Sequence, residues 1–372
     1  MTSPGRAASS RAPETTRARW HGVDVARGLA VLGMMAAHTW PRDATQSELF
    51  VDGRPSVLFA VVAGVALGLV TGGAEPPTTR RGAARGRLAI RAAVLVMMGL
   101  LLWMLPSGIA IILDYYGVMF LLLVPLLLAP RWLLGAVAVG LLVVAPLVRD
   151  RVVELTGVGP TGPVVSGNDL FATIVDYLLT GYYPALLWLP LLLVGLLCAR
   201  AGLASTRVRI LMVGLGTAAS AAGYGAAAAL PAVDAAAHSG TLAELLGAGG
   251  LAVAIIGLAL LTLDGERPNR IVGLIAAPLT ALGRVALTVY VVHVLIIAAL
   301  EPLGPAGRFE ASVGVALLIV LSLGGMGFGL VCQALGRRGP LEWLLSSVAG
   351  LPFRARTGSP GHDHDQSARL GA

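Results

Sequence analysis

The chain has 372 residues, of which 56% are hydrophobic and only 13% are charged, and its mean hydropathy is +0.81. A soluble domain carries about 25% charged residues, so this composition excludes an ordinary soluble fold and indicates a polytopic membrane protein. The net charge of +7 reflects basic cytoplasmic loops, and we expect no nucleic-acid partner. All 27 basic residues are arginine, which we attribute to coding bias rather than to chemistry.

The N-terminal residues 1–22 are polar and rich in arginine, so we expect a disordered cytoplasmic segment. A basic stretch before an apolar run is also typical of a signal peptide. Asp24 and Arg27 interrupt the apolar run that follows, which favours an uncleaved first transmembrane helix. The polar residues 351–372 are expected to form a second disordered cytoplasmic segment, which leaves residues 23–350 as one transmembrane domain.

Long apolar runs predict an all-α polytopic bundle of about ten transmembrane helices. The longer segment 149–182 contains a stretch that suits a short interfacial helix, and residues 271–284 read as amphipathic or re-entrant. In chain order, the ten predicted helices cover residues 23–40, 56–72, 88–105, 112–129, 132–148, 183–199, 210–230, 243–263, 285–301 and 312–335.

The distribution of arginine predicts the orientation of this bundle. With the N-terminus inside, the cytoplasmic segments hold 21 arginines and the external segments hold 5. This asymmetry follows the positive-inside rule, so we expect both termini in the cytoplasm of a multi-pass plasma-membrane protein. Cys198 and Cys332 fall near cytoplasmic helix ends and are expected to be free thiols.

Three ionisable residues share one face of the first predicted helix. Asp24 and Arg27 are three residues apart, and His38 lies eleven residues after Arg27, which is close to a whole number of turns. A charged side chain at the bilayer centre costs at least ~2.5–3.5 kcal/mol, so such residues usually face the bundle interior. The stripe therefore predicts an ion pair near the cytoplasmic end and a candidate catalytic imidazole near the outer end. The alternative is a purely structural pair, with His38 reaching towards water.

A second candidate site lies in the ninth predicted helix. Tyr290 and His293 are three residues apart and therefore share one helical face. An ionisable residue inside a membrane helix is a functional candidate. The alternative is a core histidine that hydrogen-bonds a neighbouring helix.

Three stretches resemble one known group of membrane proteins. They are RWHGVDVARGLAVLGMMAAH (19–38), LGRVALTVYVVH (282–293) and RRGPLEWLL (337–345). They are similar to the transmembrane acyltransferase superfamily, and most of all to bacterial relatives of heparan-α-glucosaminide N-acetyltransferase and neighbouring uncharacterised membrane families. The resemblance spans residues 19–350, although the middle of the chain shares only hydropathy.

The resemblance implies that acyl-CoA, with acetyl-CoA as the expected donor, binds from the cytoplasm and that an acceptor sugar or glycan is acylated outside. The best-known relative uses a histidine in the first external loop, and residues 39–56 contain none. His38 matches the place where the glycan O-acyltransferase branch keeps a histidine. His293 matches the histidine of a Tyr-x-x-His pattern that begins at Tyr290. The resemblance thus implies catalytic roles for His38, His293 and Tyr290.

The residue types suit acyl transfer. A neutral imidazole can take the proton of the acceptor or hold the acyl group itself. The phosphates of CoA need cations, and four arginines lie on the predicted cytoplasmic side, although they are also explained by positive-inside anchoring: Arg80, Arg81, Arg85 and Arg87.

Weaker candidates lie at the outer helix ends. Asp52 and Arg54 precede the second helix and are expected to shape the outer site. Asp114, with Tyr115 and Tyr116, begins the fourth helix and is expected to bind a polar acceptor. The alternative for each is a solvated helix end. Ordinary zinc-ligand spacing is absent, so we expect no metal.

Three functions remain open on the sequence. The first is the acyltransferase. A transporter or flippase of a small polar or lipid-linked substrate would also use intramembrane His, Asp and Arg side chains, but we find no inverted repeat. The third is a membrane sensor or scaffold. Besides membrane lipids, a second copy of the chain is a possible partner.

Overall fold

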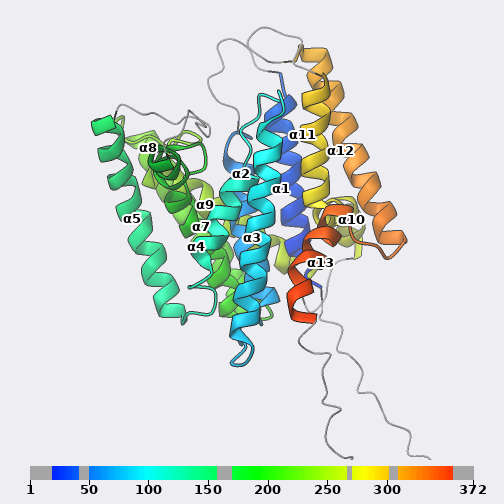
Figure 1. Ribbon diagram of the computed structural model, residues 1–372, viewed down its shortest axis with the longest axis horizontal. Coiled ribbons are helices and arrows are strands. Elements are labelled where there is room, and N and C mark those ends of the chain that lie inside the picture. The colour runs from blue at the N-terminus through cyan, green and yellow to red at the C-terminus, as the bar shows by residue number, and fades with distance from the viewer. Residues whose placement is uncertain (1–18, 42–49, 157–169, 266–269, 301–308, 355–372) are drawn as a thin grey trace, which may run out of the picture.

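The computed structural model describes residues 19–41, 50–156, 170–265, 270–300 and 309–354, with side chains as far as residue 350. The described residues form helices joined by short connections, as predicted for an all-α fold (Figure 1). The helices are α1 (His21–Thr39), α2 (Arg54–Val70), α3 (Arg81–Trp103), α4 (Leu113–Leu123), α5 (Arg131–Thr156), α6 (Leu170–Val175), η1, a π-helical turn (Asp176–Thr180), α7 (Ala185–Ala201), α8 (Thr206–Ala229), α9 (Leu242–Leu263), α10 (Arg270–Arg284), α11 (Ala286–Leu300), α12 (Ala311–Ala334) and α13 (Pro340–Arg354).

Each of the ten predicted helices overlaps an observed one. Five helices (α3, α5, α8, α9 and α12) are long and apolar enough to cross a membrane. The number rises to seven if two bent pairs each count as one span: α6–η1 with α7, bent by 45°, and α10 with α11, bent by 74°. Both α2 and α4 are shorter apolar helices. The chain is thus a helical membrane protein, and the count of ten spans stays a prediction.

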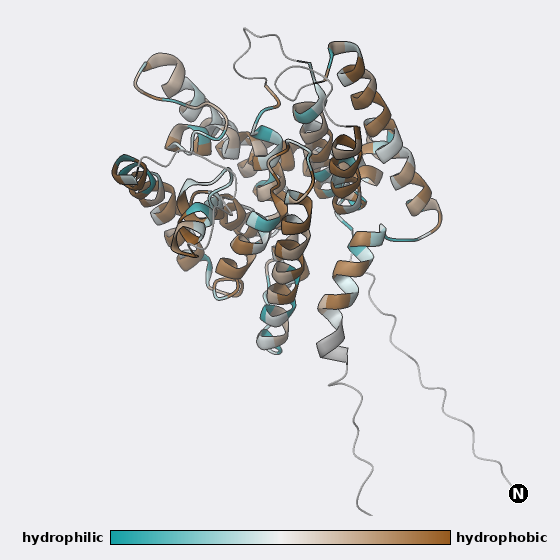
Figure 2. Cartoon of the chain, turned by 45° about the horizontal axis from the view of Figure 1, so that its top comes forward, coloured by the Kyte–Doolittle hydropathy of each residue, from teal (hydrophilic) through white to brown (hydrophobic). Residues whose placement is uncertain are grey.

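Large apolar side chains cover the outward faces of the bundle. Met97, Val139, Leu215 and Leu323, from four of the long helices, are all exposed. Hydrophobic residues dominate the long helices in Figure 2. This surface is what a bundle surrounded by lipid presents.

Helix α1 stands in the middle of the bundle, with α5 at one edge and α12 at the other (Figure 1). It packs against α2, α9, α10, α11 and α12. The carboxylate of Asp264, just after α9, accepts the backbone N–H groups of His21 and Gly22 at 2.9 and 2.6 Å. A negative charge stabilises the start of a helix, so Asp264 fixes where α1 begins.

Two glycines let α1 and α10 approach closely. A β-carbon on Gly28 would overlap the carbonyl of Leu279, and one on Gly283 would overlap the carbonyl of Asp24. Small residues at such positions allow membrane helices to pack backbone to backbone. Gly28, in the stretch 19–38 that carries the family resemblance, is therefore a packing residue.

We expect Gly28→Val to destabilise the protein by ~1–3 kcal/mol or more, because α1 and α10 must separate to accommodate the side chain. Thermal unfolding of the purified protein measures the effect. Gly214→Val is the matched control, since Gly214 also lies inside a helix and faces open space. Equal losses in the two variants would contradict the packing role.

Two buried arginines hold one end of the bundle, which we call the arginine end. Arg200 donates to the carbonyls of Gly68, Thr71, Gly73 and Leu127, and to the Thr71 hydroxyl. Arg209 donates to the carbonyls of Leu203, Leu260 and Asp264. Gly68 and Thr71 lie at the end of α2, and Leu260 and Asp264 at the end of α9, where a helix runs short of backbone donors, so the guanidinium groups supply donors there.

Candidate active site

The two histidines singled out from the sequence are in direct contact. His38 lies in the last turn of α1, and His293 lies in the middle of α11. Nδ1 of His38 is 3.0 Å from Nε2 of His293, and the rings stack with their centroids 5.3 Å apart. His293 is fully buried and His38 is half-buried. We call this end of the bundle the histidine end.

The surroundings of His293 favour one proton arrangement. Its Nε2 faces His38, so the backbone carbonyls of Val289 and Tyr290, one turn earlier on α11, are left to Nδ1. Among the described residues Nδ1 makes no hydrogen bond of regular geometry, and these carbonyls are its natural acceptors. With the proton on Nδ1, Nε2 accepts the Nδ1–H of His38. Nε2 of His38 then carries the lone pair that a general base or nucleophile needs.

Tyr290 links this pair to the segment before α4. Its ring meets that of His293 edge to face, with centroids 5.1 Å apart. Its hydroxyl accepts the backbone N–H of Ile112 at 3.3 Å. Tyr290 is buried, so the Tyr-x-x-His pattern forms one packed unit inside the bundle.

The predicted ion pair of α1 is confirmed. Asp24 accepts from Arg27 at 3.1 Å and from Arg19 at 2.6 Å. Arg27 also donates to the carbonyl of Gly283 at 3.3 Å, at the bend between α10 and α11. The pair therefore joins α1 to the base of the helix that carries His293.

Asp114 is fully buried, so its interpretation as a solvated helix end is wrong. Its Oδ2 accepts from Trp103 Nε1 at 3.0 Å and from the Tyr177 hydroxyl at 2.7 Å. Neighbouring Tyr116 donates to the carbonyl of Ser56 at 3.1 Å. These contacts pack the start of α4 into the histidine end.

The structure places Arg54 against α8. Arg54 Nε donates to the Tyr224 hydroxyl at 3.0 Å, and the guanidinium group lies over the rings of Phe50 and Tyr224. Arg54 also donates to the carbonyl of Asp52. The contacts described for Arg54 thus involve neither His38 nor His293, and they organise the entry to α2.

The four arginines predicted to bind CoA lie around the start of α3, and all are exposed: Arg80, Arg81, Arg85 and Arg87. Arg85 donates to the carbonyl of Pro125 at 3.1 Å, and Arg81 to that of Pro77 at 3.4 Å. They lie at the arginine end, away from the histidines.

Glu342, for which no role was predicted, caps the start of α11. Its carboxylate accepts the backbone N–H groups of Leu287 and Thr288 at 2.7 and 3.0 Å and the Thr288 hydroxyl at 2.6 Å. In return, the Thr288 hydroxyl accepts the N–H of Leu341 at the start of α13. The GPLEW stretch therefore ties α13 to the start of the helix that carries Tyr290 and His293.

Asp176 and Tyr177 were also missed. Both lie in η1, within the stretch expected to form a short interfacial helix. Tyr115 donates to Asp176 at 3.2 Å, while Tyr177 donates to Asp114. The signal that was available is the repeated Asp-Tyr dipeptide at 114–115 and 176–177.

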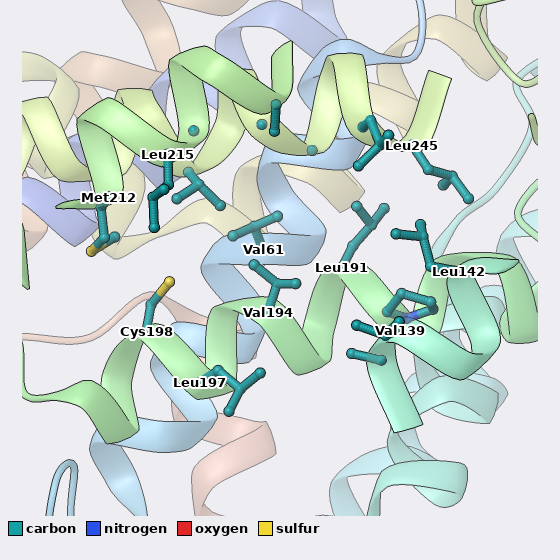
Figure 3. Close-up of a pocket in the computed structure, with 18 of the residues that line it drawn as sticks. Val61, Val139, Leu142, Leu191, Val194, Leu197, Cys198, Met212, Leu215 and Leu245 are labelled. Atoms are coloured by element: carbon teal, nitrogen blue, oxygen red, sulfur yellow. The ribbon is translucent and has the colours of Figure 1, made fainter. Parts of the chain in front are cut away.

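A cavity of about 450 Å³ lies elsewhere, between α2, α5, α7, α8 and α9 (Figure 3). Its lining is almost wholly apolar and includes Val61, Leu191 and Cys198. The polar faces of the first and ninth predicted helices also predict that the two helices line one cavity open to the outside. That cavity is not among the described ones and stays a prediction. Cys198 and Cys332 are free thiols, as predicted. Within the described ranges, no three His, Cys, Asp or Glu side chains gather to hold a metal ion.

Comparison with known proteins bears on the resemblance. No curated protein matches the chain. The sequence model of a family described as the acyltransferase domain matches residues 20–332, from the start of α1 almost to the end of α12, and includes both histidines. The chain therefore belongs to the acyltransferase domain family of membrane proteins.

Proposed function

We propose that the protein transfers an acyl group, with acetyl-CoA as the expected donor, from the cytoplasm to a sugar or glycan acceptor outside the plasma membrane. Membership of the acyltransferase domain family supports acyl transfer. The observation that carries the site is the contact between His38 and His293, since a fully buried and a half-buried imidazole from distant helices meet in a membrane bundle. The similarity to relatives of heparan-α-glucosaminide N-acetyltransferase supports the choice of donor and acceptor.

We infer that His38 carries out the chemistry. Its Nε2 takes the proton of the acceptor hydroxyl or amine as that group attacks the thioester carbonyl, and CoA leaves as the thiolate. Alternatively, Nε2 attacks the thioester first and passes the acyl group on. In both routes His293 holds the His38 ring through Nε2 and stabilises the imidazolium that forms.

The function is tested by incubating the purified protein with acetyl-CoA and a panel of sugars and lipid-linked sugars. Release of the CoA thiol together with an acetylated acceptor supports the proposal. Translocation of a substrate without any acyl-CoA requirement would favour the transporter instead.

Contacts in the bundle support ten spans with both termini inside. Chain segments predicted to lie on the same side of the membrane meet one another. At the histidine end these contacts join Thr39 with Gly314, Gly53 with Ala237, and Arg149 with Gly240. At the arginine end they join Gly22 with Ala259, Thr71 with Arg200, and Ala74 with Arg131.

Single cysteines test this topology. In a Cys198→Ala, Cys332→Ala background, Asp234→Cys should react with an impermeant maleimide on intact cells, because Asp234 lies exposed beyond α8. Gly82→Cys, at the start of α3, should react only after permeabilisation. The reverse pattern would place His38 in the cytoplasm and end the assignment of an external acceptor.

The donor is expected to use the arginines at the start of α3. Arg81→Ala with Arg85→Ala should weaken acetyl-CoA binding roughly 2- to 30-fold at low salt, since each exposed ion pair contributes ~0.2–1 kcal/mol. High salt should shrink the difference because it screens exposed charges. Calorimetry measures the affinity, and Arg151→Ala, an exposed arginine at the histidine end, is the control. Unchanged binding would show that the arginines at the start of α3 serve only to orient the protein in the membrane.

A further inference from the structure

Two Asp-Tyr dipeptides exchange hydrogen bonds beside the candidate active site. Asp114 and Tyr115 begin α4, and Asp176 and Tyr177 form η1. The Tyr115 hydroxyl donates to Asp176 at 3.2 Å, and the Tyr177 hydroxyl donates to Asp114 at 2.7 Å. The two tyrosine rings lie 4.8 Å apart. We call these four residues the Asp–Tyr cluster.

Each carboxylate of the cluster keeps one oxygen without a partner. Asp114 is 0% exposed and Asp176 is 4% exposed. Within the part of the chain that the structure describes, Oδ1 of each accepts no hydrogen bond, and neither carboxylate forms an ion pair. Buried carboxylate oxygens almost always find donors, because leaving them unpaired costs free energy. The two open oxygens therefore point to a bound molecule that brings its own donors.

The backbone of the cluster is also specialised. Asp176 and Tyr177 lie in a π-helical turn, a rare conformation that is frequent at functional sites. Gly181 follows this turn, and a β-carbon there would overlap the Tyr115 hydroxyl and crowd the Asp176 carboxylate. The missing β-carbon therefore lets both groups pack directly against the backbone at Gly181.

The cluster is continuous with the histidine pair. Ile112, two residues before Asp114, donates its backbone N–H to the Tyr290 hydroxyl, and the Tyr290 ring meets that of His293. These contacts thus connect His38 through His293 and Tyr290 to the backbone of Ile112, two residues before Asp114. A molecule held by the cluster would lie next to the residues proposed to transfer the acyl group.

We propose that the Asp–Tyr cluster is the acceptor subsite, in which Oδ1 of Asp114 and Oδ1 of Asp176 accept hydrogen bonds from hydroxyl or amino groups of a sugar. This inference rests on the proposed function. The rings of Trp103, Tyr115 and Tyr177 supply apolar surface beside the carboxylates, as a sugar requires. Because neither acid pairs with a cation within the described ranges, an amino sugar binds more tightly than the corresponding neutral sugar.

The probes are D-glucosamine and D-glucose, titrated into the purified protein by calorimetry. Glucosamine should bind the wild type more tightly than glucose. Asp114→Asn and Asp176→Asn, which keep the shape of the side chain but place an amide N–H₂ where a donor must approach, should each weaken glucosamine binding at least tenfold. Acetyl-CoA binding should not change. Asp234→Asn, an exposed acid beyond α8, should behave as the wild type.

Where an asparagine variant fails to fold, Gly181→Ala keeps both acids but displaces the Tyr115 hydroxyl that donates to Asp176, so it should also weaken glucosamine binding. Failure of both sugars to bind the wild type, or full affinity in the Asn variants, overturns the subsite. If acetyl transfer occurs with an unchanged KM for glucosamine in these variants, the subsite fails and the proposed function stands. If binding depends on the acids but no transfer occurs, the proposed function fails and the subsite stands.

Discussion

Replacing His38 by alanine is expected to lower acyl transfer by about 10²–10⁴-fold, the range that one positioned acid or base contributes. Acetyl-CoA binding and thermal stability should stay close to those of the wild type, because His38 is half-buried and acts on the proton or acyl group in the transition state. Transfer rates at saturating donor measure the loss. His21→Ala is the matched control, since His21 lies on the same helix and is exposed.

His293→Ala is expected to lower transfer as well, with some loss of stability because His293 is fully buried. Since His38 and His293 share one hydrogen bond, they act as a unit, and the double variant should lose scarcely more activity than His38→Ala. If the fold-loss of activity in the double variant equals the product of the two single losses, the two imidazoles act independently. Full activity of the His38→Ala variant would show that His38 is not a catalytic residue.

Removing the carboxylate of Glu342 is expected to destabilise the protein by ~2–4 kcal/mol, since hydrogen bonds to a charged group contribute ~1.5–3 kcal/mol each and the charge also stabilises the start of a helix. In Glu342→Ala, the N–H groups of Leu287 and Thr288 lose their acceptor where α11 begins. Thermal unfolding measures the stability, and acyl transfer should fall too, because α11 carries Tyr290 and His293.

Glu342→Gln keeps the shape and one acceptor oxygen but removes the charge, so its stability should lie between those of Glu342→Ala and the wild type. Glu154→Ala, which removes an exposed glutamate that pairs with Arg151, should have little effect. A Glu342→Ala protein as stable as the wild type would show that α11 does not depend on this cap.

The helices and the shared face of the ionisable residues in α1 could be predicted from the sequence, because both follow from local periodicity. Apolar runs mark the helices, and the spacing of Asp24, Arg27 and His38 places them on one face of α1 whatever surrounds it. The helix that this face contacts lies far away in the sequence. The contact between His38 and His293 depends on how α1 and α11 pack, which the polar faces make favourable but do not specify.

The missed residues depend on interactions across the fold. Asp176 reads as one more external acid, because the turn of π-helix that buries it has no sequence period. Glu342 reads as part of a short tail, because its carboxylate acts on the backbone of α11, 54 and 55 residues earlier. Asp114 was recognised as a candidate, and its burial comes from Trp103 and Tyr177, which hydropathy alone does not bring to it.

Arg200 and Arg209 change how the arginine-only composition is understood. Each places one flat, forked group among carbonyls from several chain segments, and the Arg209 guanidinium also lies over the Trp20 ring. A lysine ammonium concentrates its three donors on one atom and cannot reach the same set. In an organism whose genome favours lysine codons, a protein with this fold would exchange its exposed arginines freely and would still retain arginine at these two positions.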